Sequence, residues 1–136
     1  MTDAPPSSSP RRTRAESGRA GREEGRFAEA VAALWLMLKG YQILGFRLKT
    51  PYGEIDLLTR KGGTLAVVEV KRRATVEIAL SAVTSKQRER LIRAGRTLAS
   101  RRSSLRQLAL RLDLIALAPG RLPRHVPNIF NDLGHA

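Results

Sequence analysis

Apolar residues recur every three or four positions over residues 19–39, which is the pattern of an amphipathic helix. Ser17 is a suitable N-cap for this helix, and Gly40 can take the left-handed conformation that ends it. One face of the predicted helix carries an apolar stripe made of Phe27, Val31, Leu34 and Leu38.

Three runs with strand character follow, and short turn sequences separate them. The turns are PYG and KGG, whose residues favour tight reversals of the chain. Antiparallel pairing of consecutive runs would form a three-stranded meander. The runs are YQILGFRLKT (41–50), GEIDLLTR (53–60) and TLAVVEVKRR (64–73).

A second helix is predicted from the capping-box pattern Thr84-x-x-Gln87 to about Ser100. The run LALRLDLIALA (108–118) then alternates in the manner of a strand, and HVPNIFND (125–132) can add an edge strand. A helical crossover between the third and fourth strands would place these two strands in one mixed sheet. The order αβββαβ(β) therefore predicts an α/β sandwich, a mixed central sheet with helices packed on its faces.

Length and charge narrow the class of protein. With 136 residues, the chain has room for one domain (18–136), preceded by a Pro-, Ser- and Arg-rich stretch (1–17) typical of a disordered tail. No apolar run suits a membrane span or a signal peptide, so we expect a soluble, cytoplasmic protein. The lack of cysteine excludes thiolate metal sites. A net charge of +13 favours nucleic acid as the partner and makes a membrane partner the weaker alternative.

Carboxylates interrupt two runs that otherwise suit buried strands. Strand alternation predicts that Glu54 and Asp56 share one face of the second strand, while Ile55 and Leu57 point to the other. Glu54 has two interpretations. It can belong to a site with Asp56, or it can simply open the strand on a solvated face, as acids often do after turns. Its place in a site therefore stays open.

Asp56 can lie beside Glu69, because the short KGG turn makes their strands neighbours, and Lys71 lies on the same face as Glu69. Two adjacent carboxylates repel each other unless a cation such as Mg²⁺ lies between them. Lys71 could orient or deprotonate a water molecule, or neutralise charge in a phosphoryl transition state. The alternative is a cross-strand set of surface salt bridges; we favour metal-assisted hydrolysis of a phosphodiester.

The pair GEIDLL and VVEVKRR resembles the motifs of the PD-(D/E)XK nuclease superfamily. The stretch 25–113 resembles the small bacterial YraN-like family, a group of uncharacterised proteins similar to archaeal Holliday junction resolvases. This resemblance implies a restriction-endonuclease-like three-layer sandwich, cleavage of branched or structured DNA with Mg²⁺ or Mn²⁺, and a homodimer. It also implies Asp56 and Glu69 as metal ligands, Lys71 as the catalytic lysine, Glu29 as an additional ligand and the carbonyl of Val70 as another.

Basic residues crowd the second helix, where they are expected to lie away from its apolar face and to contact phosphates. The resemblance places the first of them, Lys86, near the scissile phosphate. We expect a DNA endonuclease, with DNA favoured over RNA. The alternatives are a non-catalytic nucleic-acid-binding module of the same fold and a protein that docks on RNA-containing assemblies. The candidate nucleic-acid-binding residues are Lys86, Arg88, Arg90, Arg93, Arg96, Arg72 and Arg73.

Overall fold

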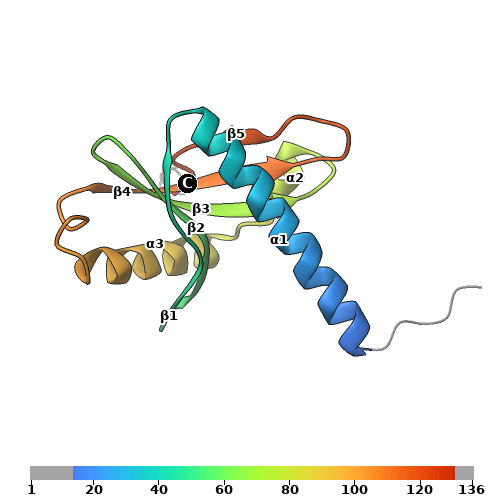
Figure 1. Ribbon diagram of the computed structural model, residues 1–136, viewed down its shortest axis with the longest axis horizontal. Helices are drawn as coiled ribbons and strands as arrows, with labels where there is room; N and C mark the ends of the chain where they lie inside the picture. Colours follow the sequence, from blue (N-terminus) through green and yellow to red (C-terminus); the bar gives the residue numbers. More distant parts are fainter. Residues whose placement is uncertain (1–13, 131–136) are drawn as a thin grey trace, which may run out of the picture.

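The computed structural model describes the backbone of residues 14–130 and the side chains from residue 24 to residue 130 (Figure 1). Within these residues it is a mixed α/β structure with a five-stranded sheet and three helices. In chain order the elements are α1 (Arg14–Leu38), β1 (Gln42–Thr50), β2 (Gly53–Lys61), β3 (Thr64–Arg72), α2 (Val76–Ser81), α3 (Ser85–Ser100), β4 (Ala109–Leu117) and β5 (Arg124–Val126).

The sheet has the strand order β1-β2-β3-β4-β5. The first three strands form the predicted antiparallel meander, β4 pairs parallel to β3, and β5 adds an antiparallel edge strand. The parallel pair requires a crossover, and α2 and α3 supply it. The predicted order and mixed sheet are confirmed, while the short helix α2 was not predicted.

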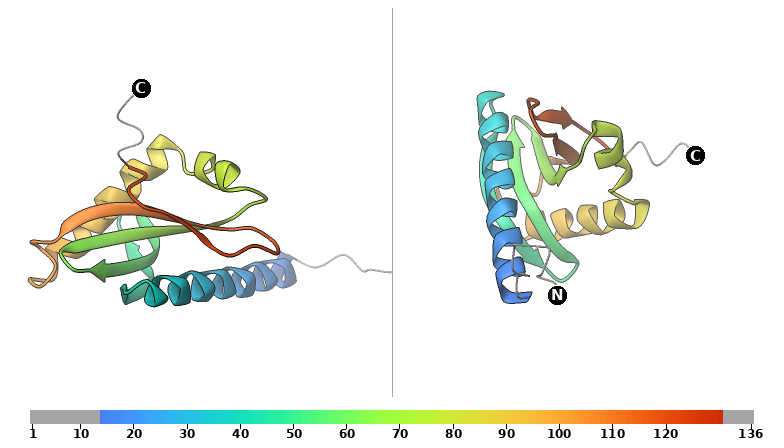
Figure 2. Two further views of the ribbon diagram at one scale, coloured as in Figure 1. Left: turned by 90° about the horizontal axis from the view of Figure 1, so that it is seen from above. Right: turned by 90° about the vertical axis from the view of Figure 1, so that its right-hand side faces the viewer.

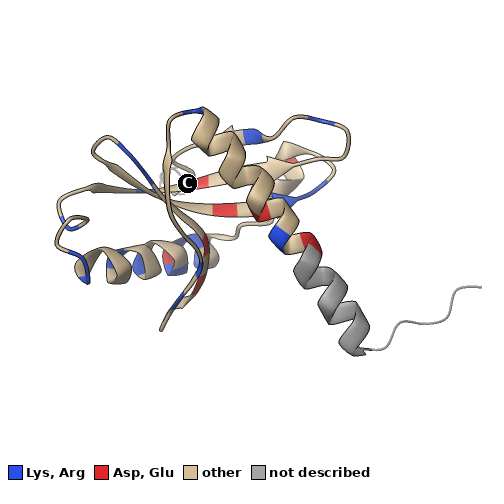
Figure 3. Cartoon of the chain, in the orientation of Figure 1, with Lys and Arg blue, Asp and Glu red and all other residues tan. Residues whose placement is uncertain are grey.

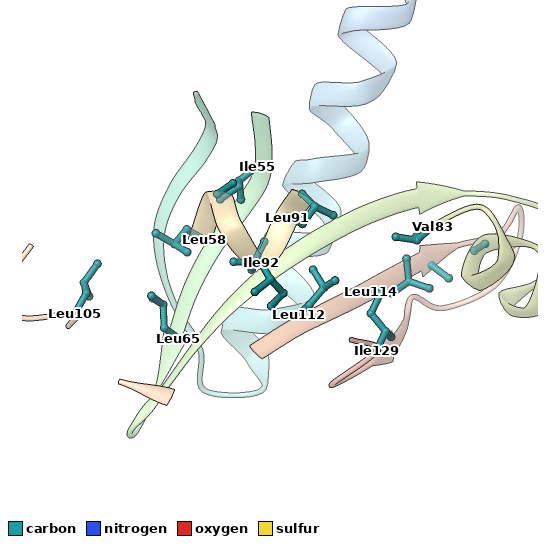
Figure 4. Packing of buried hydrophobic residues seen from close by; sticks show 14 residues of the cluster. Ile55, Leu58, Leu65, Val83, Leu91, Ile92, Leu105, Leu112, Leu114 and Ile129 are labelled. Atoms are coloured by element: carbon teal, nitrogen blue, oxygen red, sulfur yellow. The ribbon is translucent and has the colours of Figure 1, made fainter. Parts of the chain in front are cut away.

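Helix α3 packs on one face of the sheet. The larger cluster of buried hydrophobic residues lies on this face (Figure 4). The predicted capping box of α3 is present, with the Thr84 hydroxyl accepting from the Gln87 N–H and the Gln87 side chain accepting from the Thr84 N–H. Leu91 and Ala94 of this helix are buried. Helix and sheet approach closely at Gly95, where an added Cβ would lie 2.6 Å from Cγ2 of Val67.

Helix α1 covers the opposite face of the sheet, so the sheet lies between α1 and α3 (Figure 2). The residues that α1 buries are mostly small. The amphipathic pattern would normally turn the apolar stripe of Phe27, Val31, Leu34 and Leu38 toward the core, but three of these side chains are exposed and only Val31 is half-buried. Small side chains let α1 lie close against the strands. The inward face consists of Ala28, Glu29, Ala32, Ala33 and Leu36.

The N-terminal boundary also differs from the prediction. Helix α1 begins at Arg14, so Ser17 lies inside the helix and is not its cap. Residues 14–17 are therefore helical, whereas the rest of the predicted tail lies outside the described residues. No helix between residues 14 and 130 combines the length and apolarity needed to cross a membrane.

Two charges on β4 pair with each other and have a structural role, as polar residues in a strand often do. Asp113 is fully buried and accepts from Arg111 Nε at 2.8 Å and Nη2 at 2.7 Å, from His125 Nε2 at 2.7 Å and from the N–H of Asn128 at 3.0 Å. The Arg111 guanidinium also donates to the Tyr41 hydroxyl at 2.7 Å. These bonds fasten the C-terminal segment to the sheet.

Candidate active site

Asp56 lies where the pairing of β2 with β3 ends. The paired register runs as far as Leu57 opposite Val68, and the N–H of Val70 then donates to Asp56 Oδ2 at 2.9 Å. The carboxylate thus replaces a strand carbonyl as the acceptor. This bond fixes the Asp56 side chain between the two strands as they separate.

The simple alternation predicted around Asp56 is wrong. Ile55 packs in the cluster under α3, whereas Leu57 packs in the cluster under α1, so the two do not share a face. Arg47 of β1 lies opposite Asp56, between two regular pairs of β1 and β2, and has a φ of 49°. A left-handed backbone is uncommon for a residue other than glycine and is typical of a functional or strained position.

Arg47 also joins β1 to α1. Its Nε donates to Glu29 Oε1 at 2.6 Å, and the Glu29 carboxylate is almost buried. The pKa of Glu29 is raised above its ordinary value, first by burial; the Arg47 hydrogen bond acts against that rise, and the charge of Asp56 adds to it. Glu29 therefore lies close enough to Asp56 for their charges to interact.

Glu69 is the most perturbed carboxyl of the site. Its pKa is raised to about 7, first by burial and then by the charge of Asp56 and hydrogen bonding with that carboxyl. Lys71 Nζ lies 3.3 Å from Glu69 Oε2 and lowers the pKa only in part. Two acids pressed together beside one lysine form the arrangement typical of a functional site.

These side chains border one pocket of about 330 Å³ between α1 and the separating ends of β2 and β3. Most of the predicted site residues line this pocket. Glu54 does not line it; that side chain is exposed on β2 opposite Lys49. The lining residues are Gly25, Ala28, Glu29, Asp56, Glu69, Val70, Lys71, Arg72 and Arg73.

The carboxylates of Asp56 and Glu69 are suitable ligands for a hard divalent cation. Such a cation would relieve the repulsion between them, which contributes to the raised pKa of Glu69. Glu29 borders the same pocket, but its carboxylate is bound to Arg47. Accordingly, within residues 24–130, no three His, Asp or Glu side chains are grouped to hold a metal ion. The fit to Mg²⁺ rests on two carboxylates, the neighbouring backbone and water.

Lys and Arg residues recur along α3 (Figure 3). Lys86, Arg90 and Arg93 line a second cavity of about 420 Å³ next to Tyr52, and Arg90 Nη1 donates to the Tyr52 carbonyl at 3.1 Å. Lys86 does not line the pocket of the carboxylates. Arg96 is exposed, as are Arg72 and Arg73, and Arg72 pairs with Glu24 at 3.0 Å.

The prediction that Arg88 is solvated and available to phosphate is wrong. Its side chain is buried and donates to three backbone carbonyls, those of Val83 at 2.8 Å, Ile129 at 2.6 Å and Leu80 at 3.1 Å. These bonds connect α2 and the turn before α3 to Ile129, which follows β5. Arg88 is therefore a structural residue.

Comparison with known proteins identifies the family. A family model described as "Uncharacterised protein family UPF0102" matches residues 28–117, the range that contains the pocket carboxylates and Lys71. The chain belongs to the UPF0102 family. It is 64% identical over 115 residues to the UPF0102 protein of Caulobacter vibrioides, covering 85% of this chain and 92% of the relative. It is 42% identical over 132 residues to the UPF0102 protein of Paramagnetospirillum magneticum, covering 94% and 96%.

The resemblance to the YraN-like family is thereby confirmed for this UPF0102 protein. Its structure adds one site residue that the sequence did not indicate. Arg47 lies in an ordinary strand run, and no feature of that run predicts a left-handed backbone or a bond to Glu29. Both depend on contacts between β1, β2 and α1, which are distant along the chain.

Proposed function

We propose that this UPF0102 protein is a divalent-cation-dependent endonuclease that hydrolyses phosphodiester bonds in DNA, on a PD-(D/E)XK, restriction-endonuclease-like sandwich. One observation carries the proposal. Asp56, Glu69 and Lys71 border a single pocket, and the Glu69 pKa is raised to about 7 by its surroundings. A solvated set of salt bridges would not bury one carboxyl and press another against it.

Asp56 and Glu69 would hold the cation, with the carbonyl of Val70 as the further ligand implied by the motif. The cation would neutralise phosphate charge and acidify a bound water. The hydrogen bond from the Val70 N–H orients the Asp56 carboxylate before any ligand binds. Lys71, on the same side as Glu69, holds a positive charge at the pocket for the negative charge that develops on phosphorus.

DNA would reach this pocket along exposed cations. Arg72 and Arg73 border the pocket itself, and Lys86, Arg93 and Arg96 are exposed on α3. Contacts of this kind bind the phosphate backbone without reading bases. Recognition by shape and charge supports branched or structured DNA as the substrate class.

A second function is favoured by the state of Glu29. Its carboxylate is bound by Arg47, which leaves Asp56 and Glu69 as the remaining pocket carboxylates, and Glu69 is already paired with Lys71. A non-catalytic DNA-binding module of the same fold would retain this arrangement without turnover. The two functions differ in whether DNA is cut.

The test is incubation of the purified protein with labelled linear, single-stranded and four-way-junction DNA in Mg²⁺, Mn²⁺ or EDTA. The nuclease proposal expects products in metal that vanish in EDTA and in Asp56→Ala. Tight, salt-sensitive binding without product in either metal would favour the binding module. Cutting that Asp56→Ala leaves unchanged would refute the assignment of the site.

A further inference from the structure

The outward side of α1 is apolar over three turns. Phe27 is 71% exposed, Leu34 is 58% exposed and Leu38 is 74% exposed, while Met37 beside them is 56% exposed. Between residues 27 and 38 the only charged residue is Glu29, whose side chain faces inward and is buried. Among residues 14–130, no other helix or strand covers this side of α1, which forms the outer layer in both views of Figure 2.

The four exposed side chains present roughly 500 Å² of accessible surface, which is the size of the largest apolar patch on a typical monomer, and such patches are often functional. A cavity of about 560 Å³ next to Phe27 and Val31 extends the surface toward Leu117, Pro119 and Pro123. The net charge of +13 would disfavour self-association anywhere that cations face each other. Pairing through the α1 stripe would not bring cations together, because the stripe is apolar.

The spacing of the stripe indicates what covers it. Phe27, Val31, Leu34 and Leu38 follow intervals of four, three and four residues, which is the seam of paired helices. These intervals read the same in both directions. A second α1 running antiparallel would therefore place Phe27 against Leu38 and Val31 against Leu34, twice.

We propose that two copies of this chain pair through the α1 stripe, with the helices antiparallel about a two-fold axis. The flanking positions Ala30, Trp35 and Met37 are uncharged, so like charges do not meet within the seam. Complete burial of both stripes would remove about 1,000 Å² of accessible surface, which is the lower bound for a specific interface. A lipid surface fits less well, because an interfacial helix turns a cationic face to water, whereas the other face of α1 packs on the sheet.

The first test is the mass of the protein in solution by light scattering and sedimentation, from about 1 to 100 μM. We expect a dimer for the wild type and a monomer for Leu34→Glu. The matched control is Ile78→Glu, which places the same charge on an apolar residue that is 50% exposed on α2, away from the stripe, and should remain dimeric. Circular dichroism checks that both variants fold. A monomeric wild type, or a dimeric, folded Leu34→Glu, would overturn the proposal.

The second test uses the absence of cysteine. Phe27→Cys and Leu38→Cys chains of different mass are mixed, equilibrated and oxidised. The antiparallel seam expects a disulfide between the two unlike chains and little between like chains. Cross-links confined to like chains would refute the antiparallel arrangement, and recovery of wild-type monomer on anionic phospholipid vesicles would replace the second copy with a membrane. Neither test depends on nuclease activity.

Discussion

Substitution of Arg88 distinguishes a structural role of this side chain from a role in DNA binding. Replacing it with methionine keeps most of its volume and removes every donor. The carbonyls of Leu80, Val83 and Ile129 would lose their partners together. Hydrogen bonds from a charged donor contribute about 1.5–3 kcal/mol each, whereas burying the guanidinium costs several kcal/mol. We therefore expect a net loss of about 3 kcal/mol in the free energy of unfolding.

Urea unfolding measures this loss. With an m-value of about 1.5 kcal/mol/M, the midpoint should fall by about 2 M. The matched control is Arg93→Met, an exposed arginine on the same helix, for which a change within about 0.5 kcal/mol is expected. DNA binding should respond in the opposite way. Arg93→Met reduces the salt dependence of binding by about one ion, while folded Arg88→Met retains it. An unchanged midpoint for Arg88→Met, or a reduced salt slope, would refute this account of Arg88.

Three further predictions concern other parts of the chain. Because the Glu69 pKa is raised from 4.5 to about 7, the folded state binds the proton more tightly, and stability should fall as pH rises from 4.5 through 7, by on the order of 3 kcal/mol. Glu69→Gln should lack this fall and Mg²⁺ should reverse it at pH 8; equal pH profiles for both proteins would contradict it. Burial alone would raise the pKa of Asp113, but bonds from His125 and Arg111 outweigh it and lower that pKa. The advantage of wild type over Asp113→Asn should therefore be full above the ordinary pKa of 3.8 and be lost as the pH falls below 3.8 through the lowered pKa. A constant difference in acid unfolding would count against this. Gly95→Ala should lower the free energy of unfolding by about 1 kcal/mol, because crowding against the sheet costs about 1–3 kcal/mol and the better helix propensity of alanine offsets about 1 kcal/mol. A rise in Tm measured by calorimetry would contradict this prediction.

Features that are determined by nearby residues could be predicted from the sequence. The capping box at Thr84 and Gln87, the turns between the strands and the order of the strands all follow from nearby residues. The collection of Asp56, Glu69 and Lys71 around one pocket also follows, because adjacent strands joined by a short turn keep their side chains close.

Features set by distant contacts could not be predicted in this way. The apolar period of α1 identified a helix but the wrong buried face, because alanines such as Ala32 allow a closer approach to the sheet than Leu34 would. Arg88 has the same local signal as its solvated neighbours, and only its carbonyl partners distinguish it. Arg47 has a left-handed backbone and binds Glu29, which lies 18 residues away along the chain, so neighbouring residues give no signal of this contact.

The central claim is that the pocket carboxylates and Lys71 form a hydrolytic site. Its most direct test is the single-turnover rate of four-way-junction cleavage in Mg²⁺ by wild type, Asp56→Asn and Glu54→Gln. Both substitutions remove one negative charge from β2, but only Asp56 borders the pocket. The account predicts that Asp56→Asn lowers the rate by at least about 100-fold while Glu54→Gln keeps it near that of the wild type. Equal rates for all three proteins would contradict it.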